Sequence, residues 1–197
     1  MITGKFLPGV GISTRGLALE LGVSQMPVRD ALSRLAAEGA VQIRSKRRIE
    51  IPLLNEARFK DLLACRLLLE PEAAVQALPH IDKARWEQIA KADLDLEAAI
   101  ADGSVLDYMQ SNHAFHFGIY RAAPRPTLVR LIETLWLQFG PYMRVVYERI
   151  GAMTSADQHH EALAAMKNGN AAALRAAIIA DIHDGMDIIG RSRWARG

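Results

Sequence analysis

The pattern of apolar and polar residues near the N-terminus predicts two short helices and two short strands. Helices are expected over 14–21 and 24–38, with a turn at Gly22–Val23 between them and Gly39 closing the second. The second helix repeats apolar residues at i, i+3, i+4 and i+7, so one of its faces is expected to be core: Val28, Ala31, Leu32 and Leu35. Strands follow at 41–43 and 48–51 around a basic tip, which predicts a helix-turn-helix with a wing.

Beyond Pro52 the spacing is helical almost to the end, and no further strand is predicted. The expected helices cover 55–78, 83–101, 104–123, 126–149, 155–168 and 171–190. Pro71 and Pro141 fall inside two of these helices and should kink or split them. The sequence therefore predicts a mainly α protein of two domains, 1–52 and 56–190.

The charge of the chain is divided unevenly between these two domains. Residues 1–52 hold eight Lys or Arg and four Asp or Glu, a balance of +4, and the remainder has a balance of −2. A basic N-terminal domain on a slightly acidic body indicates an anionic partner for the first domain only.

Cysteine content and hydropathy indicate the compartment. Cys65 is the single cysteine and lies in an apolar helical stretch, so it is expected to be a small buried side chain in a reducing environment. The sequence shows no bilayer-spanning apolar run and no signal-peptide pattern. We therefore expect a cytoplasmic protein with no membrane partner.

One polar face of the second predicted helix is suited to DNA. Gln25, Arg29 and Ser33 lie four residues apart, and Arg29 could bind guanine O6 and N7 through two hydrogen bonds. Ser24 and the helix N-terminus suit a phosphate, and the basic tip at 44–48 could reach the DNA backbone or minor groove. The alternative is an ordinary solvated helix face, because helical hairpins often show such spacing.

The motifs around this helix resemble those of the GntR family of bacterial regulators. GKFLPG at 4–9 and LALELGVSQMPVRDALSRLAAEG at 17–39 resemble the winged helix of that family. The resemblance implies DNA contacts from Arg15, Ser24, Gln25, Met26 and Arg29 on the helices and from Ser45 and Lys46 at the wing tip. Gln25 replaces the usual Arg or Lys, Met26 replaces a small hydroxyl residue, and the first helix of the family's winged helix is expected to be missing.

The last helices predicted for the second domain carry five of the six histidines, all but His80. His116, His160 and His183 lie on three different predicted helices, each on an apolar stripe, and Asn112 precedes His116 by one helical turn. Three imidazoles and an oxygen ligand from facing helices could hold Zn²⁺ or a similar divalent ion. The alternative is that each is a hydrogen-bonded core histidine, and the spacing leaves both possibilities open.

The same region resembles the FCD sensing domain of the FadR-type branch of the GntR family. The similar landmarks are Arg66 with Glu70, Asn112 with His116, His160 followed by Gly169–Asn170, and His183. The resemblance implies an antiparallel helical bundle that binds a divalent metal, Zn²⁺ or another ion such as Ni²⁺, through Asn112, His116, His160 and His183. It also implies a small carboxylate effector next to the metal.

Arg66 is the expected contact for an effector carboxylate, because a guanidinium binds a carboxylate through two hydrogen bonds. The alternative, weighed equally, is an ion pair between Arg66 and Glu70 one helical turn apart.

Three functions are compatible with these features. The favoured one is a homodimeric repressor that binds operator DNA and responds to a small organic acid. A helical metalloenzyme is an alternative, although no general base is evident near the expected ligands. In the third, the helical domain only holds two DNA-binding domains together, and it binds neither metal nor effector.

Overall fold

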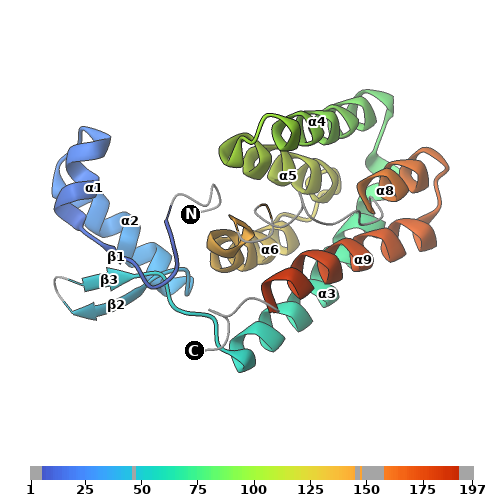
Figure 1. Ribbon diagram of the computed structural model, residues 1–197. Helices are drawn as coiled ribbons and strands as arrows, with labels where there is room; N and C mark the ends of the chain where they lie inside the picture. The colour runs from blue at the N-terminus through green and yellow to red at the C-terminus, as the bar shows by residue number, and fades with distance from the viewer. Residues whose placement is uncertain (1–5, 46–47, 145–146, 148–157, 191–197) are drawn as a thin grey trace.

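The structure is a computed structural model that describes residues 6–45, 48–144, 147 and 158–190. These residues form a small N-terminal domain, residues 6–51, which we call the head, and a larger helical domain, residues 56–190, which we call the bundle (Figure 1). The head contains β1 (Gly11–Ile12), α1 (Thr14–Leu21), α2 (Gln25–Ala37), β2 (Gln42–Ser45) and β3 (Arg48–Glu50). A short extended segment joins the two domains (Figure 1).

The two head helices begin and end where the sequence predicts. The Ser13 side chain accepts a hydrogen bond from the Gly16 N–H at 3.1 Å and so caps α1. Gly22 and Gly39 follow α1 and α2 with φ of 66° and 71°, a left-handed conformation that glycine adopts without a Cβ clash. These two glycines set the turn between the helices and the turn into β2.

The head has its own small core and a three-stranded antiparallel sheet in the order β1-β3-β2. β2 and β3 are the predicted wing strands, whereas β1 was not predicted. The core lies between α1, α2 and the sheet, and its buried residues are Ile12, Ala18, Val28, Leu32, Val41, Ile49 and Ile51. Leu35 packs partly against this core and Ala31 is exposed, so the predicted apolar face of α2 is narrower than expected.

The described part of the bundle is helical throughout. It comprises α3 (Glu56–Ala77), the 3₁₀ turn η1 (Leu78–His80), α4 (Lys83–Ala101), α5 (Val105–Tyr120), α6 (Pro126–Phe139), η2 (Gly140–Tyr142), α8 (Gln158–Lys167) and α9 (Ala171–Gly190). α4 packs along α5, and α9 runs beside both α3 and α8 (Figure 1). None of the described helices is both long and apolar enough to cross a membrane.

The two internal prolines behave differently. α3 continues through Pro71 without a break in its assignment, whereas the helix expected over 126–149 ends at Phe139. Gly140 and Pro141 follow, and the chain tightens there into the 3₁₀ turn η2. The split predicted at Pro141 is therefore confirmed, and the one at Pro71 is not.

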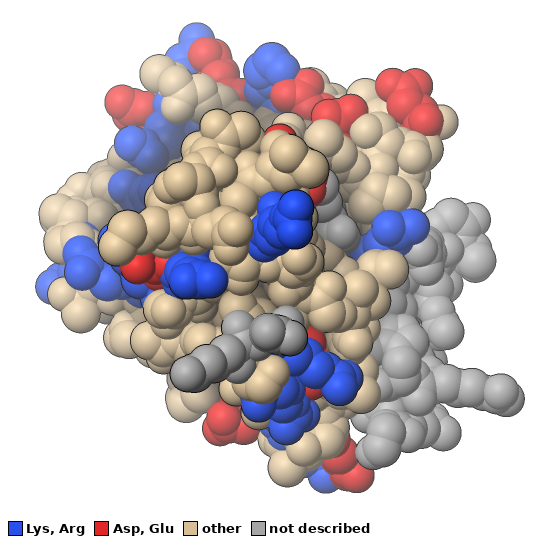
Figure 2. All heavy atoms as spheres, turned by 90° about the vertical axis from the view of Figure 1, so that its left-hand side faces the viewer, with Lys and Arg blue, Asp and Glu red and all other residues tan. Residues whose placement is uncertain are grey.

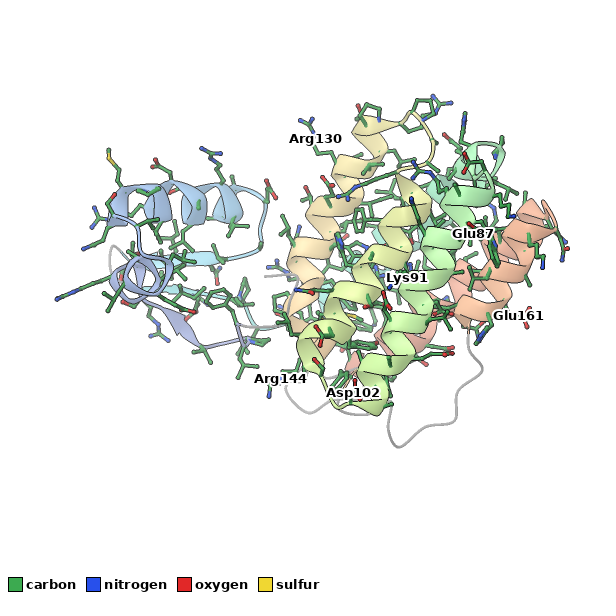
Figure 3. All side chains as sticks on the ribbon, turned by 90° about the horizontal axis from the view of Figure 1, so that it is seen from above. Glu87, Lys91, Asp102, Arg130, Arg144 and Glu161 are labelled. Carbon is green, nitrogen blue, oxygen red and sulfur yellow. The ribbon has the colours of Figure 1, made fainter. Side chains whose placement is uncertain are left out.

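Arg58, in the first turn of α3, joins the head to the bundle. Its Nη2 donates hydrogen bonds to the Gly39 carbonyl at 2.5 Å and to Gln138 Oε1 on α6 at 3.0 Å. Nearby, the Tyr142 hydroxyl donates to the Pro52 carbonyl. The end of α2 is thus held against the end of α6, and Figure 3 shows the head beside the bundle from above. We call this set of contacts the joint.

Candidate functional site

The buried polar site of the bundle is built around His116 on α5. Its side chain is 1% exposed, with Nδ1 3.2 Å from the Tyr120 hydroxyl and Nε2 3.3 Å from Asp181 Oδ2 on α9. The Tyr120 hydroxyl donates to Glu70 Oε2 on α3 at 2.9 Å. Because that proton goes to Glu70, the Tyr120 oxygen accepts from Nδ1–H of His116, which assigns the Nδ1-protonated tautomer.

His159 on α8 also points toward Asp181, the residue that His116 contacts. Its Nδ1 lies 2.7 Å from Asp93 Oδ1 on α4, and its Nε2 lies 3.6 Å from Asp181 Oδ1. Asp93 is a buried carboxylate, so it accepts the Nδ1 proton and fixes the same tautomer in His159. Its Nε2 therefore carries a lone pair directed to Asp181.

These contacts bring together three groups that can only accept. One ligand atom each of His116, His159 and Asp181 lies within 4.8 Å of the others, and both Nε2 atoms contact the Asp181 carboxylate. Two ligands of one tetrahedral Zn²⁺ lie about 3.4 Å apart, close to the 3.3 Å and 3.6 Å of the two histidine–Asp181 contacts. The Nδ1 atoms of the two histidines point away from Asp181 and contact the Tyr120 hydroxyl and the Asp93 carboxylate. Histidines that bind metals are commonly oriented by acceptors placed in this way.

The protonation states also suit a cation. Burial, reinforced by the charges of His159 and Arg66, lowers the pKa of His116 well below 6.5, so this ligand is neutral at neutral pH. Burial raises the pKa of Asp181 even though His159 and Arg66 act to lower it. Neutral His116 can therefore offer its Nε2 lone pair to a cation, and a cation beside Asp181 would favour the charged carboxylate that burial disfavours.

Asn112 lies one helical turn before His116 on α5 and is also buried. Residues four apart share a helix face, so its amide oxygen belongs to the side of α5 that carries His116. The structure thus keeps two of the four expected ligands, Asn112 and His116, on one buried face.

The structure does not bring the other two expected ligands to His116. The His160 side chain is 61% exposed, with Nε2 3.8 Å from Glu97 Oε1, and His183 is exposed on α9. Successive helical residues point about 100° apart, so His159 faces the bundle while His160 faces out. On α9, Asp181 takes the inward position and His183, two residues later, faces away.

A register signal in the sequence could have identified the inward residues. On α8 the buried positions are 159, 162, 163, 165 and 166, and His159, Ala162, Leu163 and Met166 have the spacing of one helix face, which does not include His160. On α9 the buried residues Ala177 and Ile178 precede Asp181 by four and three positions. The expected set is therefore corrected to His116, His159 and Asp181, with Asn112 beside them.

Arg66 and Glu70 form the ion pair that was one of the two alternatives. Arg66 Nε donates to Glu70 Oε1 at 2.6 Å and its Nη2 to Oε2 at 3.3 Å, with side chains 4% and 0% exposed. Because Glu70 also accepts from Tyr120, the pair is connected to His116 by an unbroken chain of hydrogen bonds. A contact between Arg66 and an effector stays a prediction.

Trp136 on α6 forms one wall of this site. Its ring centroid lies 5.2 Å from that of His116 and 5.4 Å from Arg66 Cζ, and Phe139 lies on the same guanidinium at 4.3 Å. Among the described residues, Trp136 Nε1 is the buried side-chain donor that lacks a hydrogen-bond partner. Such a group is costly unless it finds an acceptor.

The predicted DNA-contact residues of the head are exposed wherever the structure describes them. Gln25, Met26 and Arg29 lie on α2, and Arg15 lies on α1. Ser24 occupies the N-cap of α2, but its side chain makes no capping hydrogen bond, unlike Ser13 on α1. Figure 2 looks onto the head and shows Lys and Arg side chains at several places on this surface.

The wing is stiffened at its base by charge. Arg44 Nε and Arg48 Nε lie 2.8 Å and 3.1 Å from the two carboxylate oxygens of Glu50, which lowers the Glu50 pKa chiefly through the hydrogen bond from Arg44. Ser45 ends β2, and Lys46, the other predicted wing contact, lies outside the described residues.

Comparison with known families agrees with both domains. The family described as bacterial regulatory proteins, gntR family, matches residues 1–51, and the FCD domain matches residues 61–184. The chain belongs to the GntR family and carries an FCD domain. Members of this family bind operator DNA, FCD domains bind small-molecule effectors, and many also bind metals.

Individual GntR relatives span most of the chain. The HTH-type transcriptional regulator McbR of Escherichia coli K12 is 28% identical over 167 residues, which cover 83% of this chain and 76% of McbR. LutR of Bacillus subtilis 168 is 26% identical over 208 residues, 94% of each chain. The transcriptional repressor RspR of E. coli K12 is 26% identical over 109 residues, 55% of this chain and 48% of RspR.

A solved structure has the same fold. The structure of E. coli McbR/YncC superposes with a TM-score of 0.85 at 24% identity, over 95% of this chain and 90% of that one. The arrangement of a winged head on a helical FCD bundle is therefore that of known GntR regulators.

Proposed function

We propose that this GntR regulator is a repressor controlled by a small carboxylate effector, which binds beside a divalent metal held in the bundle. The observation that carries the proposal is the convergence of two imidazole Nε2 atoms on the carboxylate of Asp181. His116 and His159 would hold the ion with Asp181, and Asn112 could add a neutral oxygen. A metal with open positions would bind a carboxylate directly.

The surroundings of this site support an anionic effector. Arg66 and Trp136 lie beside His116, and both side chains can donate but not accept hydrogen bonds. Asn112 is neutral, so the proposed ligands carry one negative charge, that of Asp181, against the two positive charges of the ion. An effector carboxylate on the metal would supply the second negative charge.

Thermal unfolding of metal-stripped, tag-free protein tests the proposal. Zn²⁺ or Ni²⁺ should raise the Tm, and one class of small carboxylate should raise it further only when metal is present. A ligand at one hundred times its Kd stabilises the native state by about 2.7 kcal/mol, which is readily measured. The carboxylate panel should include hydroxy acids, sugar acids, dicarboxylates and amino acids.

Matched variants separate the buried site from other histidines. His116→Ala and His159→Ala should abolish the metal-dependent rise, whereas His183→Ala removes an exposed histidine and should leave it intact. If the metal-dependent rise in Tm persists in both His116→Ala and His159→Ala, the proposed metal site is rejected. A wild type that responds to no metal and no acid would favour a bundle that serves only as a scaffold.

For the head, we propose that α2 lies in the DNA major groove, with Gln25, Met26 and Arg29 toward the bases. Ser24 and Arg15 would contact phosphates, and Ser45 with Lys46 would contact the backbone from the wing. The exposure of the helix residues and the uncapped hydroxyl of Ser24 support these roles. As a cytoplasmic homodimer, the protein would bind a near-palindromic operator with half-sites about one helical turn apart.

The repressor role rests on the relative RspR, which is named as one, and is tested by transcription. An operator would first be selected from random DNA by its binding to the protein and placed in a promoter. Addition of purified protein to transcription reactions on that promoter should then lower the yield of transcript. The stabilising carboxylate, added with Zn²⁺, should restore the yield. Increased transcription on addition of the protein would instead identify an activator.

A further inference from the structure

A second group of ligand-type side chains lies at the contact of α4 with α8. Asp93 and Glu97 are one turn apart on α4, and His160 projects from α8 beside them. One ligand atom of each residue lies within 4.8 Å of the others, and His160 Nε2 is 3.8 Å from Glu97 Oε1. Two packed helices therefore position a cluster that the buried site does not use.

The cluster combines one fixed ligand with two accessible ones. The Asp93 side chain is 3% exposed and is oriented by its 2.7 Å contact with His159, whereas Glu97 and His160 are 46% and 61% exposed. Figure 3 shows Glu87 and Lys91 along α4 and Glu161, the residue after His160, at the outer edge of α8. An ion could reach this cluster from solvent without opening the bundle and would keep bound water.

We propose that Asp93, Glu97 and His160 form a second divalent-metal site on the surface of the bundle. Two carboxylates match the charge of a dication, and the imidazole selects a transition metal such as Zn²⁺ over Mg²⁺ or Ca²⁺. With three ligands, two of them mobile, the site binds more weakly than the buried one. His160 is thus a metal ligand, but of a different site from the one expected from the sequence.

Asp93 links the two sites because its carboxylate serves both. An ion on Asp93 withdraws negative charge from the group that accepts the His159 Nδ1 proton, which makes His159 a poorer ligand. Changes to such outer partners typically alter metal affinity about 10-fold to 100-fold. Occupancy of the surface site should therefore weaken the buried site about tenfold, and the reverse effect must be equal.

Equilibrium dialysis of tag-free, chelator-stripped protein against Zn²⁺ tests this inference. The wild type should bind two Zn²⁺ per chain, one tightly and one more weakly. His160→Ala and Glu97→Gln should each lose the weaker ion alone, whereas the exposed control His183→Ala should keep both. The tight ion should bind about tenfold more tightly in His160→Ala when measured at Zn²⁺ levels that fill the surface site of the wild type.

Several results would overturn the surface site. These are a single Zn²⁺ per chain that His160→Ala leaves unchanged, or a weaker ion that persists in both His160→Ala and Glu97→Gln. The buried site is tested separately by His116→Ala, which should remove the tight ion only. If His116→Ala removes nothing while His160→Ala removes one ion, the surface site stands and the proposed buried site fails.

Discussion

The buried side chains of Arg66 and Glu70 should be strongly coupled in their effect on stability, and a double-mutant cycle can measure this coupling. Glu70 accepts three hydrogen bonds, two from Arg66 and one from Tyr120, while all three side chains are almost fully excluded from water. Arg66→Met would leave a carboxylate without its counter-ion, and Glu70→Leu would leave a buried guanidinium without one. Each single change should cost about 3–5 kcal/mol, the usual penalty of breaking a buried ion pair.

The double variant should behave differently, because it removes both charges together. Methionine and leucine fill the same space beside Phe139 without a charge, so the main remaining cost is the Tyr120 hydroxyl left without Glu70. That orphaned group costs about 1–3 kcal/mol. The double variant should therefore be more stable than either single variant or similar to the better one, with a coupling energy of at least about 3 kcal/mol.

Urea denaturation followed by circular dichroism gives these free energies of unfolding, measured on chelated protein so that metal does not contribute. Additive effects of the two substitutions would refute the reasoning, because they would mean that the charges do not interact. Single changes that each cost under about 1 kcal/mol would refute it as well, since that is the range of a solvent-exposed pair.

Three further predictions concern the sites. Burial lowers the pKa of His116, so below pH 6.5 the unfolded chain binds a proton at this residue that the folded chain does not bind. The free energy of unfolding of the metal-free protein should therefore decrease as pH falls from 6.5 toward the lowered pKa. Urea titrations at pH 7.5 and 5.5 should show a smaller decrease for His116→Gln than for the wild type. Arg29→Ala should cost about 1–3 kcal/mol of operator binding and relax specificity at one base pair, whereas Lys46→Ala should weaken all DNA sequences alike and flatten the salt dependence; equal operator binding by Arg29→Ala and wild type would reject that assignment. Trp136→Phe removes the unpartnered indole donor and should weaken the carboxylate-dependent Tm rise without changing Zn²⁺ binding, and an unchanged carboxylate response would exclude that donor from the effector site.

Most of the fold could be predicted because strong local signals mark its boundaries. Gly22 and Gly39 have the left-handed backbone that ends or follows a helix, and Asn55, Asp82 and Ser104 cap α3, α4 and α5 through their side chains. β1 was not predicted because its two residues are too few to show an alternation of apolar and polar positions. Its pairing with β3 is what defines it as a strand. Pro71 does not split α3, whose helix runs from Glu56 to Ala77.

The sequence placed candidate ligands on α5, α8 and α9, and the structure brings His116 of α5 together with different residues of α8 and α9. His116 was identified because its neighbours form a clear buried face. On α8 the choice fell on His160, although the apolar residues Ala162, Leu163 and Met166 share a helix face with His159. Asp181 was missed because an aspartate in the middle of a helix is normally a surface residue. Its role follows from the two histidine contacts, which join segments that are remote in sequence.

The position of α6 indicates how the bundle could influence the head. Trp136 and Phe139 on this helix lie against the Arg66 guanidinium, while Gln138, between them in sequence, contacts Arg58 at the joint. A ligand that changes the packing around Arg66 therefore acts on the turn of α6 that contacts Arg58, and Arg58 also binds the Gly39 carbonyl just after α2. We expect coupling along this path to appear as a change in operator affinity when the bundle binds its effector.

Arg58→Ala should reduce this coupling. The substitution removes two hydrogen bonds of a half-buried cation, which together contribute about 1–3 kcal/mol, without touching the core of either domain. Operator affinity would be measured by fluorescence anisotropy, with and without Zn²⁺ plus the stabilising carboxylate. In the wild type the two affinities should differ several-fold, and in Arg58→Ala they should approach each other. Lys60→Ala, which breaks an exposed pair with Glu56 on the same helix, is the matched control and should keep the wild-type ratio. If Arg58→Ala keeps that ratio as well, the signal does not pass through the joint.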